Sequence, residues 1–300
     1  MDLGYDGSLF LLAFDHRGSF KSKMFGIDEP TAADEARLRA AKQLVWSGFE
    51  AAGAEGLPDG AGILVDEEMG SAVARAARAA GIPFAMPVER SGQDVFDFEY
   101  ADDFGAHIEE FDPTFAKVLV RWNPDDALEI KVLQAERLNR LGGWLHERGR
   151  LFLFELLVPA SARQLDLVGG DPQSYDHDLR PALMLETIDE LHGRGVEPDI
   201  WKIEGIDSPD YCRRIADLVR SDGRERVACV VLGRGADEAR VDHWLTTAAP
   251  IDGYAGFAIG RSIWWEAVSE WRDARASAAE AAARIGRSYR RFIDIYQNAV

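Results

Sequence analysis

The sequence predicts a (β/α)8 barrel, and two observations support this fold class. First, eight short apolar runs alternate with longer segments whose apolar residues recur at helical spacing. Second, the runs are apolar at nearly every position, which is typical of parallel strands buried on both faces. Eight such units in 300 residues favour a closed barrel, and no linker rich in Pro, Gly or Ser divides the chain. We therefore expect residues 1–300 to form a single barrel domain.

Each predicted strand ends where an apolar run meets polar residues or glycine, as LFLLAF does at Asp15 and GILV does at Asp66. The predicted strands are 9–14, 62–65, 82–87, 115–120, 151–158, 199–203, 226–232 and 253–259. The segments between these strands have apolar residues at helical spacing, which predicts that they are helices. The predicted helices are 34–54, 71–80, 102–111, 125–148, 180–194, 209–220 and 236–248, followed by a helical C-terminal tail from about 262. Within this tail, the Ala-rich segment 274–284 is predicted to be helical from propensity.

Charge and composition exclude several kinds of partner. Acidic residues outnumber basic ones by 52 to 34, and the formal net charge of −18 disfavours nucleic acid and anionic membranes. No apolar run approaches the ~20 residues that span a bilayer, and the first ten residues do not resemble a signal peptide. We therefore expect a cytoplasmic protein whose cysteines, Cys212 and Cys229, are buried reduced thiols. A phosphorylated substrate would need a local basic pocket.

Two lysines lie inside apolar runs, Lys117 in FAKVLV and Lys202 in DIWKI. A barrel strand offers such a side chain no solvent face, and burial lowers the pKa of a lysine. The two lysines belong to alternate strands, whose inward side chains share layers, so a second ammonium would lower the pKa further. An amine becomes a nucleophile near neutral pH in this way. The alternative is buried ion pairs, Lys202 with Glu204 or Lys117 with Glu155.

A carboxylate lies within the predicted fifth strand. Glu155 is the only polar residue of LFLFELL. Burial would raise the pKa of this carboxylate unless it is paired, and a raised pKa suits proton transfer. A structural role as the partner of a lysine is the alternative, because ion-pair networks perturb pKa values as well.

The last two predicted strands end in similar loops, VLGRGA (231–236) and IGRSIW (259–264). Each places a glycine and an arginine before a predicted helix start: Gly233 with Arg234, and Gly260 with Arg261. The corresponding loops of such barrels often bind phosphate through backbone N–H groups at a helix N-terminus, and arginines add charge. Ordinary turns with solvated arginines are the alternative for either loop alone, but the two together predict a phosphate site.

Polar residues at other strand ends are candidates for contacting a substrate, because barrel enzymes bind it at that end. They are Asp15, His16 and Arg17 after the first strand and Asp66 after the second. The acidic run 66–68 has the oxygens to hold magnesium, but a solvated or substrate-facing turn is commoner. No histidines are spaced as zinc ligands and no nucleotide-binding loop is present, so we expect neither a metal nor a cofactor.

Seven segments resemble the class I tagatose-1,6-bisphosphate aldolase-like family. They are LLAFDHRGSF (11–20), ILVDEEMG (63–70), AKVLVRWNPDD (116–126), LFLFELL (151–157), DIWKIEG (199–205), VVLGRGA (230–236) and FAIGRSIWW (257–265). The resemblance implies that Lys202 forms a Schiff base with a ketone and that Glu155 transfers protons. It further implies that Lys117, Asp15 and His16 contact the hydroxyls or the reacting carbonyl of the substrate.

For the phosphate, the same resemblance implies a site formed by Arg261 and the backbone near Gly233 and Gly260. Tagatose-type members have Asp-Gln where this chain has Asp15-His16. The histidine form is similar to the branch of myo-inositol catabolism, whose substrate is 2-deoxy-5-keto-gluconate 6-phosphate. The implied products are dihydroxyacetone phosphate and malonate semialdehyde. Tagatose bisphosphate and sulfofructose phosphate remain alternative substrates.

Two other functions fit the same barrel. One is a metal-dependent aldolase or isomerase that uses Asp66, Glu68 and His16. The other is a barrel that binds a sugar phosphate for regulation without turning it over. In each case the expected partner is a small sugar phosphate. A homo-oligomer is also possible, since the tryptophans of the segment 264–271 suit either an interface or the core.

Overall fold

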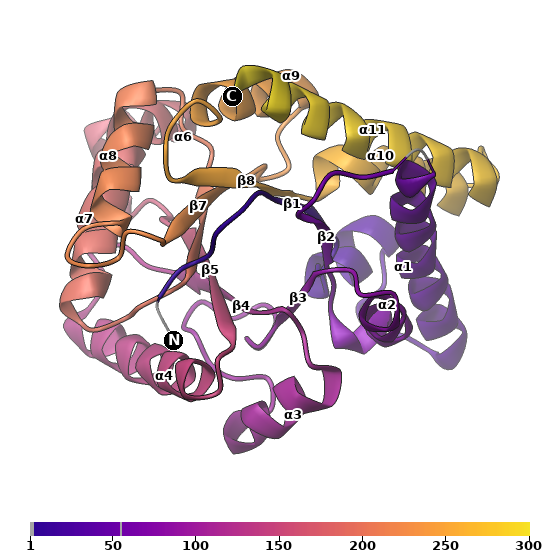
Figure 1. Ribbon diagram of the computed structural model, residues 1–300, viewed down its shortest axis with the longest axis horizontal. Helices are drawn as coiled ribbons and strands as arrows, with labels where there is room; N and C mark the ends of the chain where they lie inside the picture. Colours follow the sequence, from indigo (N-terminus) through magenta and orange to yellow (C-terminus); the bar gives the residue numbers. More distant parts are fainter. Residues whose placement is uncertain (1–2, 55) are drawn as a thin grey trace.

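The chain folds into a closed barrel of eight parallel strands in sequential order, which confirms the predicted fold class. The structure is a computed structural model and describes residues 3–54 and 56–300. Each strand pairs with the next, and β8 pairs with β1 to close the barrel (Figure 1). The strands are β1 Leu9–Ala13, β2 Ala61–Leu64, β3 Phe84–Pro87, β4 Phe115–Arg121, β5 Leu151–Leu157, β6 Ile200–Glu204, β7 Ala228–Leu232 and β8 Tyr254–Ile259.

Helices surround the barrel and connect its strands (Figure 1). The main ones are α1 Ala32–Gly53, α2 Glu67–Ala79, α3 Phe104–Phe111, α4 Leu128–Glu147, α7 Arg180–Gly193, α8 Pro209–Val219, α9 Glu238–Ala248, α10 Arg261–Arg272 and α11 Ala278–Ala299. Short helical segments are η1 Phe20–Met24, η2 Ala101–Asp103, α5 Ala162–Leu167, α6 Pro172–Ser174 and η3 Tyr175–Leu179. In the part of the chain that the structure describes, no helix is both long and apolar enough to cross a membrane.

Two apolar cores follow from the alternation of side chains along the strands. Residues such as Leu11, Leu153 and Ile200 fill the interior of the barrel. Their neighbours on the strands, such as Phe154 and Trp201, pack outward against the helices in a larger core. This double burial explains why the strands are apolar throughout. Cys212 and Cys229 are buried free thiols of the outer core, as expected.

The C-terminal tail consists of two helices rather than one. Helix α11 begins at Ala278 because the Ser277 side chain accepts a hydrogen bond from the backbone N–H of Glu280 and caps it. Before this cap, Ala274 has a left-handed backbone with φ of 56°, so the first residues of the predicted segment 274–284 form a turn. Helix α11 then returns along α1 and α10, and the Tyr289 hydroxyl donates a hydrogen bond of 2.6 Å to the carbonyl of Phe10 in β1.

The start of α2 and the region 162–179 also differ from the sequence prediction. Helix α2 begins at Glu67 rather than at residue 71, because Asp66 accepts a hydrogen bond from the backbone N–H of Met69 and acts as its N-cap. The region 162–179, for which no element was predicted, forms the short segments α5, α6 and η3. Segments of this length carry too few apolar repeats to show a helical period.

The crossing of α11 with α1 depends on a glycine, which gives a stability prediction. A Cβ on Gly286 would lie 2.8 Å from the carbonyl oxygen of Gly48 and 3.0 Å from the backbone nitrogen of Ala52. Gly286→Val must therefore push the helices apart, and we expect it to lower the free energy of unfolding by about 2 kcal/mol or more in urea titrations. Gly143→Val is the control, because nothing lies within 4 Å of its Cβ position in α4. Equal effects of the two substitutions would contradict this account of the packing.

Candidate active site

Three charged side chains lie on neighbouring strands of the barrel. Lys117 on β4, Glu155 on β5 and Lys202 on β6 are each less than a tenth exposed. Side chains two residues apart share one face of a strand, so each lies directly above a residue of the barrel interior. Those residues are Phe115, Leu153 and Ile200. The three charged groups therefore form one layer on an apolar floor.

A pocket of about 360 Å³ opens above this layer. The structure brings together here nine of the eleven site residues expected from the sequence. They are Asp15, His16, Arg17, Lys117, Glu155, Lys202, Arg234, Gly260 and Arg261. The other two, Asp66 and Gly233, do not line the pocket.

Lys202 is 2% exposed and lies opposite Glu155 in the register of β5 and β6. Its ammonium donates a hydrogen bond of 2.9 Å to Oε2 of Glu155. The alternative partner, Glu204, instead lies 2.9 Å from Nε of Arg234 and accepts a hydrogen bond from the backbone N–H of Val158. Among the residues that the structure describes, Lys202 thus has one carboxylate partner, and it lines the open pocket.

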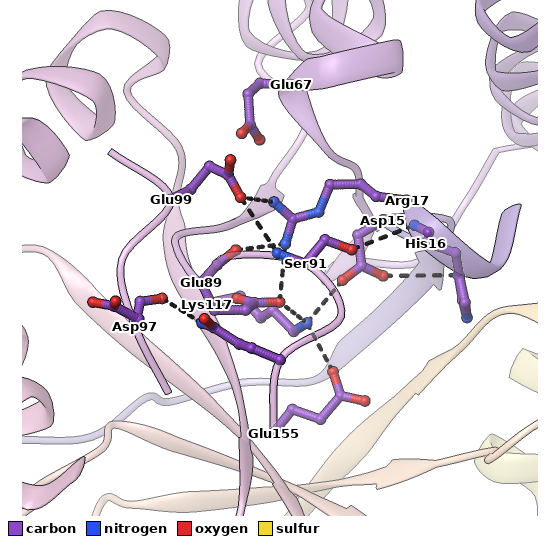
Figure 2. A network of polar contacts seen from close by, with 12 residues as sticks. Asp15, His16, Arg17, Glu67, Glu89, Ser91, Asp97, Glu99, Lys117 and Glu155 are labelled. Carbon is purple, nitrogen blue, oxygen red and sulfur yellow. Dashed lines mark hydrogen bonds and ion pairs between the residues drawn. The ribbon is translucent and has the colours of Figure 1, made fainter. Parts of the chain in front are cut away.

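Lys117 is the centre of a buried ion cluster (Figure 2). Its ammonium lies 2.9 Å from Asp15, 2.8 Å from Glu89 and 3.1 Å from Glu155. Burial disfavours this ammonium, but the carboxylates outweigh burial and raise the pKa of Lys117 well above its ordinary value. The expectation that burial would lower this pKa is therefore wrong for Lys117, which stays charged.

Glu155 and Asp15 remain ionised. Burial disfavours both carboxylates, but the nearby Lys117 and Lys202 outweigh it and hold the pKa of each carboxyl below its usual range. Glu155 is paired, so its pKa is lowered rather than raised as expected for an unpaired carboxylate. One oxygen, Oε2, lies within 3.1 Å of both lysine nitrogens. Glu155 therefore contacts both ammonium groups and is the carboxylate with which Lys202 can exchange a proton.

His16 lies beside this cluster on the loop after β1. Burial, opposed by Asp15 and assisted by nearby cations such as Lys42, lowers the pKa of His16 to about 4. The ring is neutral near pH 7 and contacts the edge of Trp264, with ring centroids 5.5 Å apart. Its Nδ1 is buried and without a hydrogen-bond partner among the described residues. His16 also lines the pocket, and a neutral imidazole there can contact a substrate hydroxyl.

Arg17 is turned toward the loop after β3. Its guanidinium donates a hydrogen bond of 2.6 Å to the carbonyl of Glu89 and another of 3.3 Å to the carboxylate of Glu99 (Figure 2). The side chain of Arg17 is also 3.5 Å from the Glu89 carboxylate. These contacts join the loops after β1 and β3. They also use several of the hydrogen-bond donors of the Arg17 guanidinium. Arg17 therefore positions the carboxylates around Lys117, although it also lines the pocket.

The two arginines of the predicted phosphate site differ in their partners. Arg234, which has a left-handed backbone with φ of 54°, lies within 2.9 Å of the carboxylates of Asp176 and Glu204. Arg261 begins α10 and donates a hydrogen bond of 3.0 Å to the carbonyl of Arg234. Among the described residues no carboxylate forms an ion pair with Arg261. Its charge is therefore the more available one for a phosphate.

Two glycines allow the loops at this end to approach closely. A Cβ on Gly260 would lie 2.2 Å from the carbonyl oxygen of Ala13. The chain directly after β8 can therefore pack against the end of β1 only because residue 260 is glycine. Gly235 has a φ of 71°, and a Cβ there would lie 2.6 Å from the Arg261 guanidinium. Gly233 contacts Ile259 of β8 instead of the pocket.

Asp66 does not line the pocket. It is fully buried, caps α2 and forms an ion pair of 2.6 Å with Lys42 of α1. Lys42 also donates hydrogen bonds to the carbonyls of Phe14 and His16. Lys42 therefore holds the loop that carries Asp15 and His16, and Asp66 supports this loop through its ion pair with Lys42.

The acidic run 66–68 does not converge on one point. Glu67 lies 3.7 Å from His107, and Glu68 accepts a hydrogen bond of 2.9 Å from Lys21. Within residues 3–54 and 56–300, no group of three or more His, Cys, Asp or Glu side chains is arranged to hold a metal ion. The residues considered for a metal-dependent reaction, Asp66, Glu68 and His16, thus have separate partners.

Sequence reasoning missed two residues of this arrangement, Glu89 and Lys42. Glu89 lies two residues beyond β3, in the same kind of strand-end position as Asp15, and that position was its signal. Lys42 occupies the apolar stripe of α1 between Leu38 and Val45, where a lysine is unusual. A charged residue on the buried face of a helix was therefore the signal for Lys42.

Comparisons with known proteins agree with the barrel. The sequence model of the family described as "Uncharacterized protein conserved in bacteria (DUF2090)" matches residues 5–300. A fructose-bisphosphate aldolase from Plasmodium falciparum superposes with a TM-score of 0.63 at 11% identity, over 97% of this chain and 91% of that chain. Cgl0159 from Corynebacterium glutamicum superposes with a TM-score of 0.55 at 17% identity, over 96% and 88%. No curated protein matches the sequence. At these identities the structural likeness concerns the fold.

Proposed function

The chain belongs to the DUF2090 family, and we propose that it is a class I aldolase that cleaves a phosphorylated keto sugar or keto sugar acid. Lys202 forms the Schiff base, and the products are dihydroxyacetone phosphate and an aldehyde. The observation that carries this proposal is the Lys202–Glu155–Lys117 arrangement at the floor of a pocket whose rim holds Arg261. The proposed substrate is 2-deoxy-5-keto-gluconate 6-phosphate, as the resemblance in the strand-end segments implies.

Schiff-base formation needs a neutral amine and a place for two protons. Glu155 takes a proton from the Lys202 ammonium across their 2.9 Å hydrogen bond, and the free amine attacks the ketone carbon. The ketone oxygen becomes a hydroxyl and leaves as water, so that one ammonium and one ketone give one iminium and one water. Lys117 keeps its positive charge throughout and stabilises the oxygen on which negative charge develops.

Cleavage then uses the iminium as an electron sink. A base removes the proton from the hydroxyl next to the bond that breaks, and Glu155 is the carboxylate closest to the amine. The electrons of the broken carbon–carbon bond form an enamine, and the aldehyde leaves. Protonation of the enamine carbon and hydrolysis by water release dihydroxyacetone phosphate. Arg261 and the backbone of the adjoining loops hold the phosphate, which determines the bond that lies over the sink.

The function is tested by measuring dihydroxyacetone phosphate release with NADH and glycerol-3-phosphate dehydrogenase, in the presence of a chelator. The substrates compared are 2-deoxy-5-keto-gluconate 6-phosphate, tagatose 1,6-bisphosphate and sulfofructose phosphate. We expect chelator-resistant release, fastest from the first. A faster reaction with either alternative would move the substrate assignment to that compound, and no release from any of the three would refute the proposal.

The phosphate end gives a paired prediction. Arg261→Ala removes a guanidinium without a carboxylate partner among the described residues, so we expect kcat/KM to fall about 10- to 100-fold, as for the loss of charge-assisted hydrogen bonds. Arg234 is held by Asp176 and Glu204, so we expect Arg234→Ala to reduce kcat/KM by less than about 10-fold. Steady-state kinetics compares the two variants. A larger loss in Arg234→Ala would reverse the assignment of the phosphate ligand.

A further inference from the structure

The pocket has a second cationic end, away from Arg261. Its lining there comes from the loop after β3 and from the end of β4, and includes Arg90, Ser91, Gln93 and Arg121. The proposed reaction uses the Lys202 layer and the phosphate end, but it assigns nothing to this region. A substrate that is held at Arg261 and reacts at Lys202 must extend toward this second end with its aldehyde half.

Arg121 belongs to the same face of β4 as the reacting layer. Lys117, Leu119 and Arg121 alternate along the strand, and all three line the pocket. Leu157 lines it in the same way, two residues after Glu155 on β5. Along β4, this side of the pocket is therefore lined first by the charged Lys117, then by the apolar Leu119 and last by the guanidinium of Arg121.

The charge of Arg121 is only loosely compensated. Its Nη1 donates a hydrogen bond of 2.8 Å to the carbonyl of Gln93, which fixes the side chain against the loop. Its nearest carboxylate, that of Asp94, is 4.0 Å from Nε and is 97% exposed. An ion pair of this kind contributes little in water. Among residues 3–54 and 56–300, Arg121 thus has donors without a partner and a fixed position, which is the condition for binding a carboxylate in the bidentate manner.

Resting on the proposed aldolase function, we propose that Arg121 binds a carboxylate at the aldehyde end of the substrate and so selects keto sugar acids over ketose bisphosphates. At about 3.3 Å per residue, the four steps from Lys117 to Arg121 rise about 13 Å along β4, and Leu119 lies at the midpoint. A three-carbon aldehyde acid with a hydrogen bond of about 2.9 Å at its end covers roughly half of this rise, and an arginine side chain, about 7 Å long, is able to cover the rest.

The surroundings favour a carboxylate over a second phosphate. Leu119 and Leu157 offer no hydrogen bond to a hydroxyl, which suits an unsubstituted methylene between the reacting carbon and the acid group. The other arginine of this end, Arg90, is 52% exposed and lies 3.9 Å from Asp97. Arg121 is held by the Gln93 carbonyl, and one fixed guanidinium matches one negative charge. A phosphate dianion next to Glu89 would need more cations.

The test runs the reaction toward condensation, with dihydroxyacetone phosphate and three aldehydes. They are 3-oxopropanoate, which carries a carboxylate, neutral propanal, and glyceraldehyde 3-phosphate. We expect wild-type kcat/KM to be highest for 3-oxopropanoate. In Arg121→Gln the ratio of kcat/KM for 3-oxopropanoate to that for propanal should fall about 10- to 100-fold. This ratio is independent of the fraction of folded enzyme. Arg90→Gln is the matched control, and its ratio should change less than about 3-fold.

The outcomes separate this inference from the proposed function. If wild-type enzyme does not exchange the α-hydrogen of dihydroxyacetone phosphate with deuterated water, the aldolase proposal itself fails. If exchange occurs but the ratio in Arg121→Gln equals that of wild type, the carboxylate site is refuted. A loss confined to Arg90→Gln would refute the assignment to Arg121. A wild-type preference for glyceraldehyde 3-phosphate that Arg121→Gln abolishes would show a second phosphate site and overturn the carboxylate assignment.

Discussion

Lys202→Arg is expected to lower kcat by at least about 10³-fold while leaving the protein folded. A guanidinium stays protonated at every pH at which the protein is stable, so it cannot attack a ketone. It can still pair with Glu155, which lies 2.9 Å from the lysine nitrogen, and this preserves the charge of the buried layer. A loss of this size corresponds to about 4 kcal/mol in the activation free energy. Steady-state assays of dihydroxyacetone phosphate release, with circular dichroism for folding, measure both effects.

The matched control is Lys131→Arg. Lys131 also pairs with a glutamate, Glu190, at 2.9 Å, but it lies on α4 outside the pocket. We expect kcat of this variant to stay within about 2-fold of wild type, because the substitution keeps the charge and lies outside the pocket. Near-normal turnover in Lys202→Arg would contradict the assignment of Lys202 as the nucleophile.

Lys117→Met is expected to destabilise the protein by about 3–5 kcal/mol near neutral pH. The substitution removes the ammonium that lies within 3.1 Å of Asp15, Glu89 and Glu155. Removing the cation of a buried ion cluster leaves its carboxylates without a compensating charge, and this strongly lowers the free energy of unfolding. Methionine fills a similar volume, so packing contributes little to the loss. Urea unfolding curves at pH 8 provide the measurement.

The pH dependence follows from the direction of the pKa shifts. In the wild type, the pKa values of Asp15 and Glu155 are lowered, so their contribution to stability is present above the unfolded pKa of about 4 and is lost as pH falls through the folded values. Without Lys117, burial dominates and raises these pKa values above those of the unfolded chain. The variant then loses stability as pH rises. The difference between wild type and variant should therefore shrink from pH 8 to pH 5.

Lys21→Met is the control for this prediction. Lys21 forms an ion pair of 2.9 Å with Glu68, whose side chain is 46% exposed. We expect a loss below about 1 kcal/mol, with little dependence on pH. A loss of this small size in Lys117→Met, or a loss that grows as the pH falls, would show that Lys117 does not compensate the cluster.

Much of the fold was predictable from the sequence, because a strand buried on both faces has no polar position. Runs such as 115–120 and 151–158 therefore indicated β4 and β5 within one or two residues. The break before α11 was less visible, since propensity favours helix across Ala274. The capping pair Ser277 and Glu280 determines where α11 begins, and it interacts over three residues only.

The residues of the site were easier to predict than their charge states. Lys117, Glu155 and Lys202 were recognisable as charges within apolar strands, and strand-end positions indicated Asp15 and His16. The pKa of Lys117 depends on Glu89, which lies 28 residues away along the chain. Such a contact follows from the register of the barrel and the path of the loop after β3, and no local pattern in the sequence contains it.

Reduction with borohydride in the presence of dihydroxyacetone phosphate tests the central claim most directly, because it converts an iminium into a stable secondary amine. Peptide mass mapping then locates the modified residue. We predict one adduct per chain, with the mass of the reduced ketone, on the peptide that contains Lys202, and none in Lys202→Arg. An adduct on Lys117 instead, or turnover of the substrate without any adduct on Lys202, would contradict the account.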